Sequence, residues 1–364
     1  MRIAYGVQGE GMGHATRSES VISYLESCGD EIEAFTSNRA HAYLSKPGRT
    51  VHAIKGFTLT YKDDALLTGT STLGIIRSLP KNLIPTIRFM LERFRELKPE
   101  VIITDHETFT ALIGKILSIP VIYAGNLAIF ERTRIDEGIL AKRYPKLLAR
   151  FTAKLSSFNA TSYVIPTFFY PETKSANVIL TDPVVRPYYS SLKPTRGNHL
   201  FVYHTSSTNE SLLAALKRTG IECRVYGYDA REPDGNLTFN AFDEKRFACD
   251  LASSKAAVLG GGFTAMSEAI YLRKPVYCVP LKNHIEQLLN ANEIEKHTFG
   301  EYHSEADAKS LFDFTLKLDL YEHYLSRYEM DPRSFERTVR EVAKLKKHEP
   351  SSDDVEELIG GLKL

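Results

Sequence analysis

The stretch AAVLGGGFTAMSEAIYLRKPVYCVPLKNHIEQLLNAN, residues 256–292, decides the fold class of this 364-residue chain. A short apolar run ends in three glycines, a helical pattern follows, and a second apolar run occupies Pro275–Val279. This order predicts a strand–turn–helix–strand unit with parallel strands. Gly260, Gly261 and Gly262 permit a tight turn before a helix that starts near Phe263. The free N–H groups and the positive dipole of that helix end indicate a phosphate site.

Polar side chains follow this turn in an ordered set. Thr264 offers a hydroxyl group, and Glu268, one helical turn further, is expected to accept both hydroxyls of a ribose. The loop over 281–287 brings Glu286 and Gln287 to the same edge, where an acid and an amide suit the hydroxyls of a hexose. The alternative is a triple-glycine turn followed by a charged, solvent-facing helix. That alternative explains the glycines but not the side chains after them.

The same alternation of strand-length and helical patterns runs through both halves of the chain. We therefore expect an α/β fold with two Rossmann-like, doubly wound parallel-sheet domains in tandem and the active site in the cleft between them. The expected divisions are a first domain over residues 1–182, a proline-containing linker over 183–198, a second domain over 199–325, and a C-terminal helical segment over 326–364 that could pack back on the first domain.

A second glycine loop lies near the N-terminus, between a strand pattern over Arg2–Val7 and a helical pattern. Gly9, Gly11 and Gly13 would let backbone N–H groups approach an anion or a sugar. The spacing is GxGxG and not GxGxxG, and no acidic residue closes the second strand, so a dinucleotide site is not indicated.

His14 follows the last of these glycines and is a candidate general base, because histidine titrates near neutral pH. Asp105 ends another strand pattern, at the same sheet edge, and could accept one imidazole N–H. His14 could instead cap its helix or face solvent. Asp105 could instead cap the helix that starts near Thr108, and one residue could serve both purposes.

Composition narrows the functional class. Lys and Arg number 46 and Asp and Glu 45, so no overall charge favours nucleic acid as a partner. The four cysteines show no CxxC spacing, which is typical of reduced thiols in a cytoplasmic protein. Because a strand pattern begins at Arg2, we expect no signal peptide. We find neither a zinc-like spacing nor a D-x-D motif after a strand, so we expect no metal and no cofactor.

Two basic segments with apolar residues at helical spacing lie in the first half, over Arg77–Lys98 and Arg132–Lys154. Such helices could rest on an anionic membrane surface, which would make the protein membrane-peripheral. Alternatively, the apolar residues face the core and the basic face is solvated.

The segment Gly260–Gln287 resembles the donor-binding signature of GT-B glycosyltransferases, in both the MurG-like and the UDP-glycosyltransferase branches. The run Gly9–Arg17 and the segment Pro99–Gly125 are similar to the same superfamily. This resemblance implies that the glycine turn holds a pyrophosphate, Glu268 the ribose, and the acid–glutamine pair the sugar. It also implies that His14 is the catalytic base, with Asp105 as its partner.

The chain departs from that pattern around the nucleobase, because it has no tryptophan to stack on uracil. We expect the region 240–242, with Phe242, to hold the base, and the hydroxyl-rich turn containing Ser206 to contact phosphate. Uracil is implied by the resemblance alone.

The implied reaction is the transfer of a hexosyl group, from a hexose or an N-acetylhexosamine, out of a UDP-sugar onto an acceptor hydroxyl. The resemblance implies inversion without a metal. The acceptor, a glycan or a lipid-linked molecule, would bind mainly to the first domain. Two alternatives stay open: a sugar-nucleotide 2-epimerase of the same fold, and a non-catalytic sugar-nucleotide-binding protein.

Overall fold

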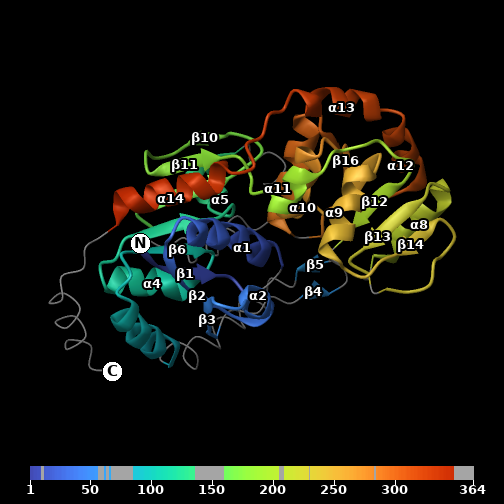
Figure 1. Ribbon diagram of the computed structural model, residues 1–364. Coiled ribbons are helices and arrows are strands. Elements are labelled where there is room, and N and C mark those ends of the chain that lie inside the picture. Colours follow the sequence, from blue (N-terminus) through green and yellow to red (C-terminus); the bar gives the residue numbers. More distant parts are fainter. Residues whose placement is uncertain are drawn as a thin grey trace.

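The computed structural model describes residues 1–9, 12–55, 61–62, 65–66, 85–135, 160–204, 209–228, 230–282 and 284–347. Within these ranges the chain forms two parallel sheets, each covered by helices (Figure 1). Gly11, Ser206 and most of the basic segment over 132–154 lie outside the described residues, as do 77–84 and 348–364.

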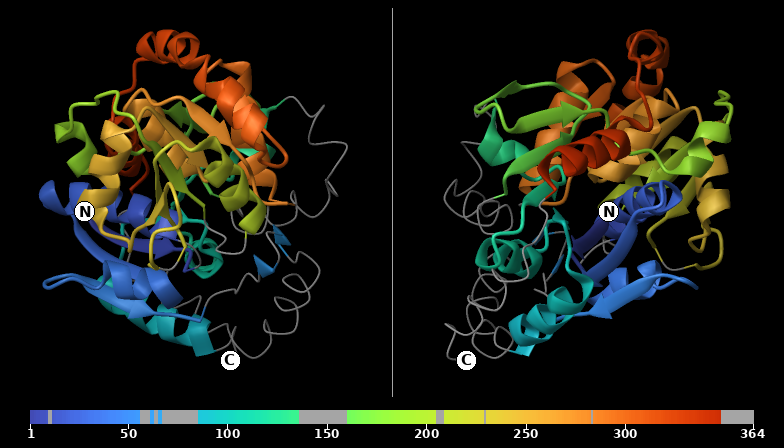
Figure 2. Two further views of the ribbon diagram at one scale, coloured as in Figure 1. Left: turned by 90° about the vertical axis from the view of Figure 1, so that its right-hand side faces the viewer. Right: turned by 60° about the vertical axis from the view of Figure 1, so that its left-hand side comes forward.

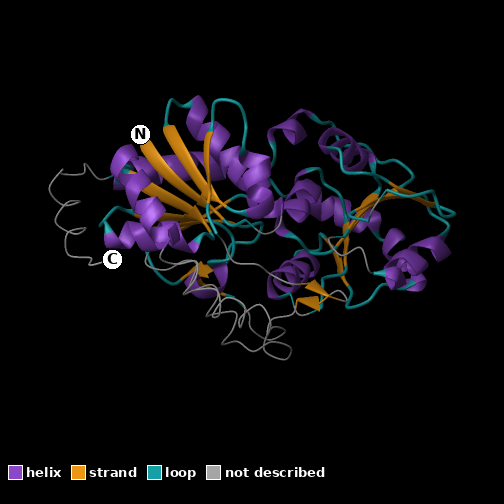
Figure 3. Cartoon of the chain, turned by 90° about the horizontal axis from the view of Figure 1, so that it is seen from below, coloured by secondary structure: helices purple, strands orange, loops and turns teal. Residues whose placement is uncertain are grey.

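The first sheet has seven parallel strands in the order β11-β9-β7-β6-β1-β2-β3. Its strands are β1 (Arg2–Val7), β2 (Glu31–Thr36), β3 (Thr50–Ala53), β6 (Val101–Asp105), β7 (Val121–Ala124), β9 (Ser162–Pro166) and β11 (Val178–Thr181). Its helices include α1 (Met12–Ser27), α2 (Asn38–Leu44), a helix over 85–97 and α4 (Thr108–Ile116). Figure 3 shows the strands lying between helices. The central strands are apolar runs because helices bury both of their faces.

The second sheet has six parallel strands in the order β14-β13-β12-β15-β16-β17. Its strands are β12 (Leu200–Tyr203), β13 (Cys223–Tyr226), β14 (Leu237–Phe239), β15 (Ala256–Leu259), β16 (Val276–Cys278) and β17 (Gly300–Tyr302). Its helices are α8 (Glu210–Thr219), α9 (Glu244–Ser253), α10 (Phe263–Tyr271), α11 (Ile285–Lys296), α12 (Ala308–Thr315) and α13 (Leu318–Ser326). Both sheets confirm the predicted doubly wound α/β fold.

Short elements complete the described chain. They are the two-residue strands β4 (Tyr61–Lys62), β5 (Ala65–Leu66), β8 (Thr133–Arg134) and β10 (Glu172–Thr173), the short helix α5 (Ile129–Arg132), and the 3-10 turn η1 (Pro187–Ser191). The turn η1 lies in the connection between the two sheets. In the described part of the chain, no helix is both long and apolar enough to cross a bilayer.

The last helix, α14 (Ser334–Lys346), follows the elements of the second sheet in the chain but packs against α1 beside the first sheet (Figures 1 and 2). Its apolar face joins the first sheet's core through the buried Phe335 and Val339. Two polar contacts fix its position: Ser20 donates to Glu336 at 2.9 Å, and Arg340 donates to Asp30 at 2.8 Å. The chain therefore crosses between the two sheets a second time.

The helix over 85–97 shows where the apolar stripe of the first basic segment points. Met90, Leu91, Phe94 and Leu97 are buried in the core, and Ile87 packs against it from a partly buried position. The described part of this segment thus matches the core-facing alternative, because apolar side chains that are already buried cannot also rest in lipid.

Candidate functional site

The two sheets present their topological switch points to each other. In the first sheet the order reverses between β1 and β6, and in the second between β12 and β15. Ligands of doubly wound sheets bind at such points, outside the carboxyl ends of the strands. The two edges meet closely, since a Cβ atom added to Gly13 would lie 3.5 Å from Oγ1 of Thr264. The beginnings of α1 and α10 therefore face one another.

Gly9 has a packing role in the first glycine loop. A Cβ atom there would lie 1.9 Å from Oγ of Ser37, the residue before α2, and 2.5 Å from its carbonyl oxygen. Any larger residue at Gly9 would displace the start of α2. Gly13, by contrast, is exposed in the first turn of α1 and faces the second domain.

His14 and Asp105 lie together at the switch point of the first sheet. Nδ1 of His14 is 3.0 Å from Oδ1 of Asp105, and their side chains are 18% and 1% exposed. An ionised carboxylate only accepts hydrogen bonds, so in the tautomer that bonds to Asp105, Nδ1 carries the proton and Nε2 can accept one. The alternative in which Asp105 caps the next helix is wrong. Glu107 caps α4 instead, because its carboxylate accepts the N–H groups of Phe109 and Thr110.

Arg17 completes this cluster, and our sequence analysis did not assign it a role. Its Nε donates to Oδ2 of Asp105 at 3.0 Å and its Nη2 to Oδ1 at 2.6 Å, while Nη2 also lies 3.1 Å from Nδ1 of His14. Burial alone would raise the pKa of Asp105, but Arg17 and His14 outweigh burial and hold that pKa below its ordinary value. The spacing of His14 and Arg17, three residues apart on one helix face, was the available indication.

His106 lies beside the base and has φ of 61°. Its ring stacks on that of His14, with centroids 5.8 Å apart and an interplanar angle of 16°. Its Nδ1 is 3.2 Å from the hydroxyl of Tyr123. Burial and the neighbouring His14 lower the pKa of His106 to about 3. A neutral imidazole therefore packs against the candidate base at physiological pH.

The second glycine turn leaves open space at the N-terminus of α10. Gly262 is the N-cap residue, and no side chain caps the helix there. A Cβ atom on Gly262 would meet no described atom within 4 Å. Gly261 has φ of 82° and would place a Cβ atom 2.8 Å from the carbonyl oxygen of Gln287, so this position requires glycine. Gly260 is confined too, since its Cβ atom would lie 3.0 Å from the His204 ring.

Side chains of the first turn of α10 differ in exposure. Thr264 is half-buried, whereas Phe263 is 6% exposed and stacks on Phe168 with ring centroids 5.9 Å apart. Phe263 can therefore offer a ligand its N–H group, and Thr264 can offer both an N–H group and a hydroxyl. Hydroxyls and free N–H groups at a helix N-terminus match the needs of a phosphate.

Glu268, which we expect to accept both hydroxyls of a ribose, has its carboxylate covered in this structure. Its side chain is 1% exposed and forms a two-bond ion pair with Arg186, at 2.6 Å from Nε to Oε1 and 2.9 Å from Nη2 to Oε2. Arg186 comes from the connection between the sheets and also donates to the hydroxyl of Tyr189. The helical spacing identified the face of α10 but could not show that a cation from the linker covers it.

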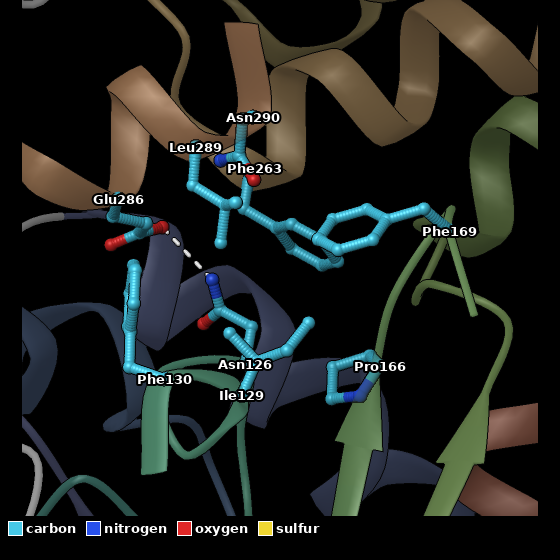
Figure 4. Close-up of a pocket in the computed structure, with 9 residues that line it drawn as sticks. All are labelled: Asn126, Ile129, Phe130, Pro166, Phe169, Phe263, Glu286, Leu289 and Asn290. Carbon is cyan, nitrogen blue, oxygen red and sulfur yellow. Dashed lines mark hydrogen bonds between the residues drawn. The ribbon is translucent and has the colours of Figure 1, made fainter. Parts of the chain in front are cut away.

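The side chains of Glu286 and Gln287, which we expect to contact the sugar together, point in different directions. Gln287 is buried, and its Oε1 accepts the N–H of Leu281 at 2.8 Å, inside the second domain. Glu286 points to the first domain, where its Oε1 accepts from Nδ2 of Asn126 at 2.9 Å (Figure 4). Consecutive helical residues point about 100° apart, which explains the divergence at the start of α11.

The region 240–242, which we expect to hold the nucleobase, exposes the side chain of Phe242 but not that of Asn240. Phe242 follows β14 and is 60% exposed, with its ring 5.4 Å from that of Phe247. Its exposed face is available for stacking on a base. Asn240 is buried and donates to the carbonyl of Thr238 at 3.3 Å, so its amide supports the loop.

A small pocket lies between the two domains beside Glu286 (Figure 4). It is mainly apolar, and its polar atoms come from Asn126, Glu286 and Asn290. Asn290 also donates to the carbonyl of Gly261 at 3.0 Å, which ties α11 to the glycine turn. The remaining lining residues are Ile129, Phe130, Pro166, Phe169, Phe263 and Leu289. This pocket joins the carboxyl edge of the first sheet to the beginnings of α10 and α11.

Comparisons with known proteins agree with this fold. The model of the family described as glycosyl transferase family 1 matches residues 1–319. An uncharacterized glycosyltransferase of Methanosarcina mazei is 25% identical over 336 residues, covering 82% of this chain and 85% of the relative. The spinosyn rhamnosyltransferase SpnG, solved with thymidine diphosphate, has a TM-score of 0.64 at 13% identity, covering 94% of this chain and all of that one. MurG of Acinetobacter baumannii has a TM-score of 0.60 at 14% identity, covering 95% and 99%.

Proposed function

The chain belongs to glycosyl transferase family 1 and has the GT-B fold, and we propose that it transfers a hexosyl group from a UDP-sugar to an acceptor hydroxyl, with inversion and without a metal. Glycosyl transfer follows from the family. The donor, the sugar class, the stereochemistry and the independence from metal are our proposal.

One observation carries this proposal: the His14–Asp105 pair and the open N-terminus of α10 face each other across the domain interface. A base and an anion site must lie on opposite sides of the reacting carbon in a direct displacement. Gly13, next to the base, and Thr264, next to the anion site, are in near contact. Both groups can therefore reach one bound donor.

The chain's own groups suffice to describe the reaction. The acceptor oxygen loses its proton to Nε2 of His14 as it attacks the anomeric carbon, and Asp105 stabilises the imidazolium that forms. The bond from the anomeric carbon to the diphosphate oxygen breaks on the opposite face, which inverts the configuration. The N–H groups of Phe263 and Thr264, with the Thr264 hydroxyl, stabilise the charge on the departing diphosphate.

The nucleotide is the least constrained part of the donor. SpnG is complexed with thymidine diphosphate, and thymine differs from uracil only by a methyl group. Phe242 can stack on either base, since every base presents a flat π face. We propose uridine because of the resemblance to UDP-glycosyltransferases.

The test incubates the purified chain with a panel of UDP- and TDP-hexoses and a panel of alcohol acceptors, with and without EDTA. We expect release of UDP that needs an acceptor and persists in EDTA, and NMR of the product should show the opposite anomer. Loss of activity in EDTA would contradict the proposed independence from metal and leave the rest of the proposal in place. An epimer formed without an acceptor would instead identify an epimerase. A UDP-sugar that stays bound and unchanged across the acceptor panel would identify a binding protein.

A further inference from the structure

We propose that Arg17 and Asn126 form a positioning relay. The relay holds Glu286 of the second domain at a fixed position relative to Asp105 and His14 of the first. This inference rests on the proposed function and on the contact with the donor sugar that the family resemblance implies for Glu286. Neither Arg17 nor Asn126 touches a reacting atom in that scheme. They act by fixing Asp105, which orients the base, and Glu286, which would contact the sugar.

The contacts of the relay are continuous. The guanidinium of Arg17 holds both oxygens of Asp105 through Nε and Nη2, and its Nη1 donates to Oδ1 of Asn126 at 3.0 Å. Nδ2 of Asn126 then donates to Oε1 of Glu286 at 2.9 Å (Figure 4). Arg17, Asp105 and Asn126 are 4%, 0% and 5% exposed, so little water competes for the bonds among them, whereas Glu286 at the end of the chain of bonds is half-buried. The two domains are thus joined through one continuous chain of hydrogen bonds.

The direction of these bonds fixes the amide of Asn126. A guanidinium can only donate and an ionised carboxylate can only accept, so the Asn126 oxygen must face Arg17 and its NH₂ must face Glu286. Aspartate has the same shape but lacks the donor, and would set a negative charge against Glu286. The relay therefore requires an amide at this position and not merely a polar residue of the right size.

Electrostatic attraction favours a relay that crosses the domain interface. Arg17 lies between a carboxylate of its own domain and Glu286 of the other. Burial would lower the pKa of Arg17, but Asp105 outweighs burial and raises it, and Glu286 adds to that rise. The attraction draws the start of α11 toward the candidate base. Because the bond to Asn126 uses Oε1 of Glu286, a sugar hydroxyl would meet Oε2. The carboxylate of Glu286 would then position the sugar, and Asn126 and Arg17, which lie beside the base, would position that carboxylate.

The test compares three variants of the full chain with the wild type: Asn126→Asp, Glu286→Gln and the two combined. Asn126→Asp should lower kcat about 10- to 100-fold, since small misplacements of reacting groups have effects of this size. It should also raise the KM for the UDP-sugar. UDP affinity, measured by calorimetry, should stay within about twofold, because UDP lacks the group that Glu286 contacts. The combined variant reverses the bond, with the introduced glutamine donating to the introduced aspartate, and should recover activity relative to Asn126→Asp.

A matched control is Asn177→Asp, the same change at an exposed residue of the first domain. If Asn126→Asp does not fold, Arg17→Lys serves instead, because lysine keeps a charge beside Asp105 but has no second arm for Asn126. Wild-type kcat and KM in the folded variants would overturn the relay, as would a combined variant no more active than Asn126→Asp. If the wild type transfers no sugar, the proposed function fails by itself. The relay is then judged by binding: Asn126→Asp should reduce the preference for UDP-sugar over UDP, and an unchanged preference would overturn it.

Discussion

Replacing Glu268 by alanine should destabilise the protein before it reveals anything about ribose binding. The carboxylate and its partner Arg186 have side chains that are 1% and 9% exposed, and two hydrogen bonds join them. Burial would lower the pKa of Arg186, but Glu268 outweighs burial and raises it. The alanine variant would leave a guanidinium in the same low-dielectric site without its main counter-charge.

The size of this loss of stability depends on the contacts that Arg186 would keep in the Glu268→Ala variant. Removing one partner of a buried ion pair costs about 3–5 kcal/mol. Arg186 would still donate to the Tyr189 hydroxyl at 2.6 Å and to Glu244, at 3.2 Å, and it would still lie 4.8 Å from the centre of the Tyr189 ring. These contacts place the loss at the lower end, about 3 kcal/mol. The free energy of unfolding of a folded protein is usually about 5–15 kcal/mol, so this loss would be a large part of it.

Urea unfolding followed by far-UV circular dichroism measures this loss, since the chain has no tryptophan to report by fluorescence. Glu96→Ala is the control, because Glu96 forms an exposed ion pair with Arg93 and should lose less than about 1 kcal/mol. Exchanging both Arg186 and Glu268 for methionine should cost less than Glu268→Ala, because no buried charge is left unpaired and the remaining Glu244 is exposed.

The refuting result is a loss below about 1 kcal/mol for Glu268→Ala, no larger than that of the exposed control. Together with weakened UDP binding, it would mean that Arg186 leaves Glu268 readily and that the carboxylate serves the ribose. A large loss of stability in Glu268→Ala would instead make the pair primarily a connection between α10 and the linker.

Three further predictions follow from the site. His14→Ala should lower turnover about 10²–10⁴-fold with near-wild-type UDP affinity, and Asp105→Asn should lower it less; wild-type kinetics in a folded His14→Ala protein would place the base elsewhere. Gly262→Ala adds a methyl group that meets no described atom within 4 Å, so stability should change by no more than about 1 kcal/mol while UDP affinity falls. Unaltered affinity in calorimetry would argue against a diphosphate at this turn. The pKa of His106 is about 3 in the folded protein, against an ordinary value of 6.5. Between these two pH values the unfolded chain binds more protons than the folded one, so the free energy of unfolding declines as pH falls from 6.5 to about 3. His106→Asn, in which asparagine tolerates the φ of 61°, should weaken that decline in urea midpoints measured between pH 4 and 7, and an unchanged decline would contradict the assignment.

The sequence was sufficient for the fold because local patterns carry that information. Apolar runs that end in Gly260–Gly262, or before the loop at Gly9, predict strands that enter helices, and their alternation predicts parallel sheets. Parallel strands of one sheet share a carboxyl edge, so residues that follow such strands are brought near one another. His14 and Asp105 are 91 positions apart in the chain, and this rule sufficed to place them together.

The sequence did not determine which charged groups meet. Arg186 and Glu268 are 82 positions apart, and Asn126 and Glu286 are 160 apart, with each pair joining different elements of the structure. Helical spacing shows which face of α10 bears Glu268 but carries no information about what covers that face. Partners of buried charges are selected when the linker and the two domains dock, because each charge must then replace its lost hydration with a specific counter-charge. The sequence therefore determined the strands, the glycine turns and the edge at which His14 lies. Only the docking of the linker decided that Glu268 is covered, and only the packing of one domain on the other decided that Glu286 turns toward Asn126, because neither contact is encoded by local spacing.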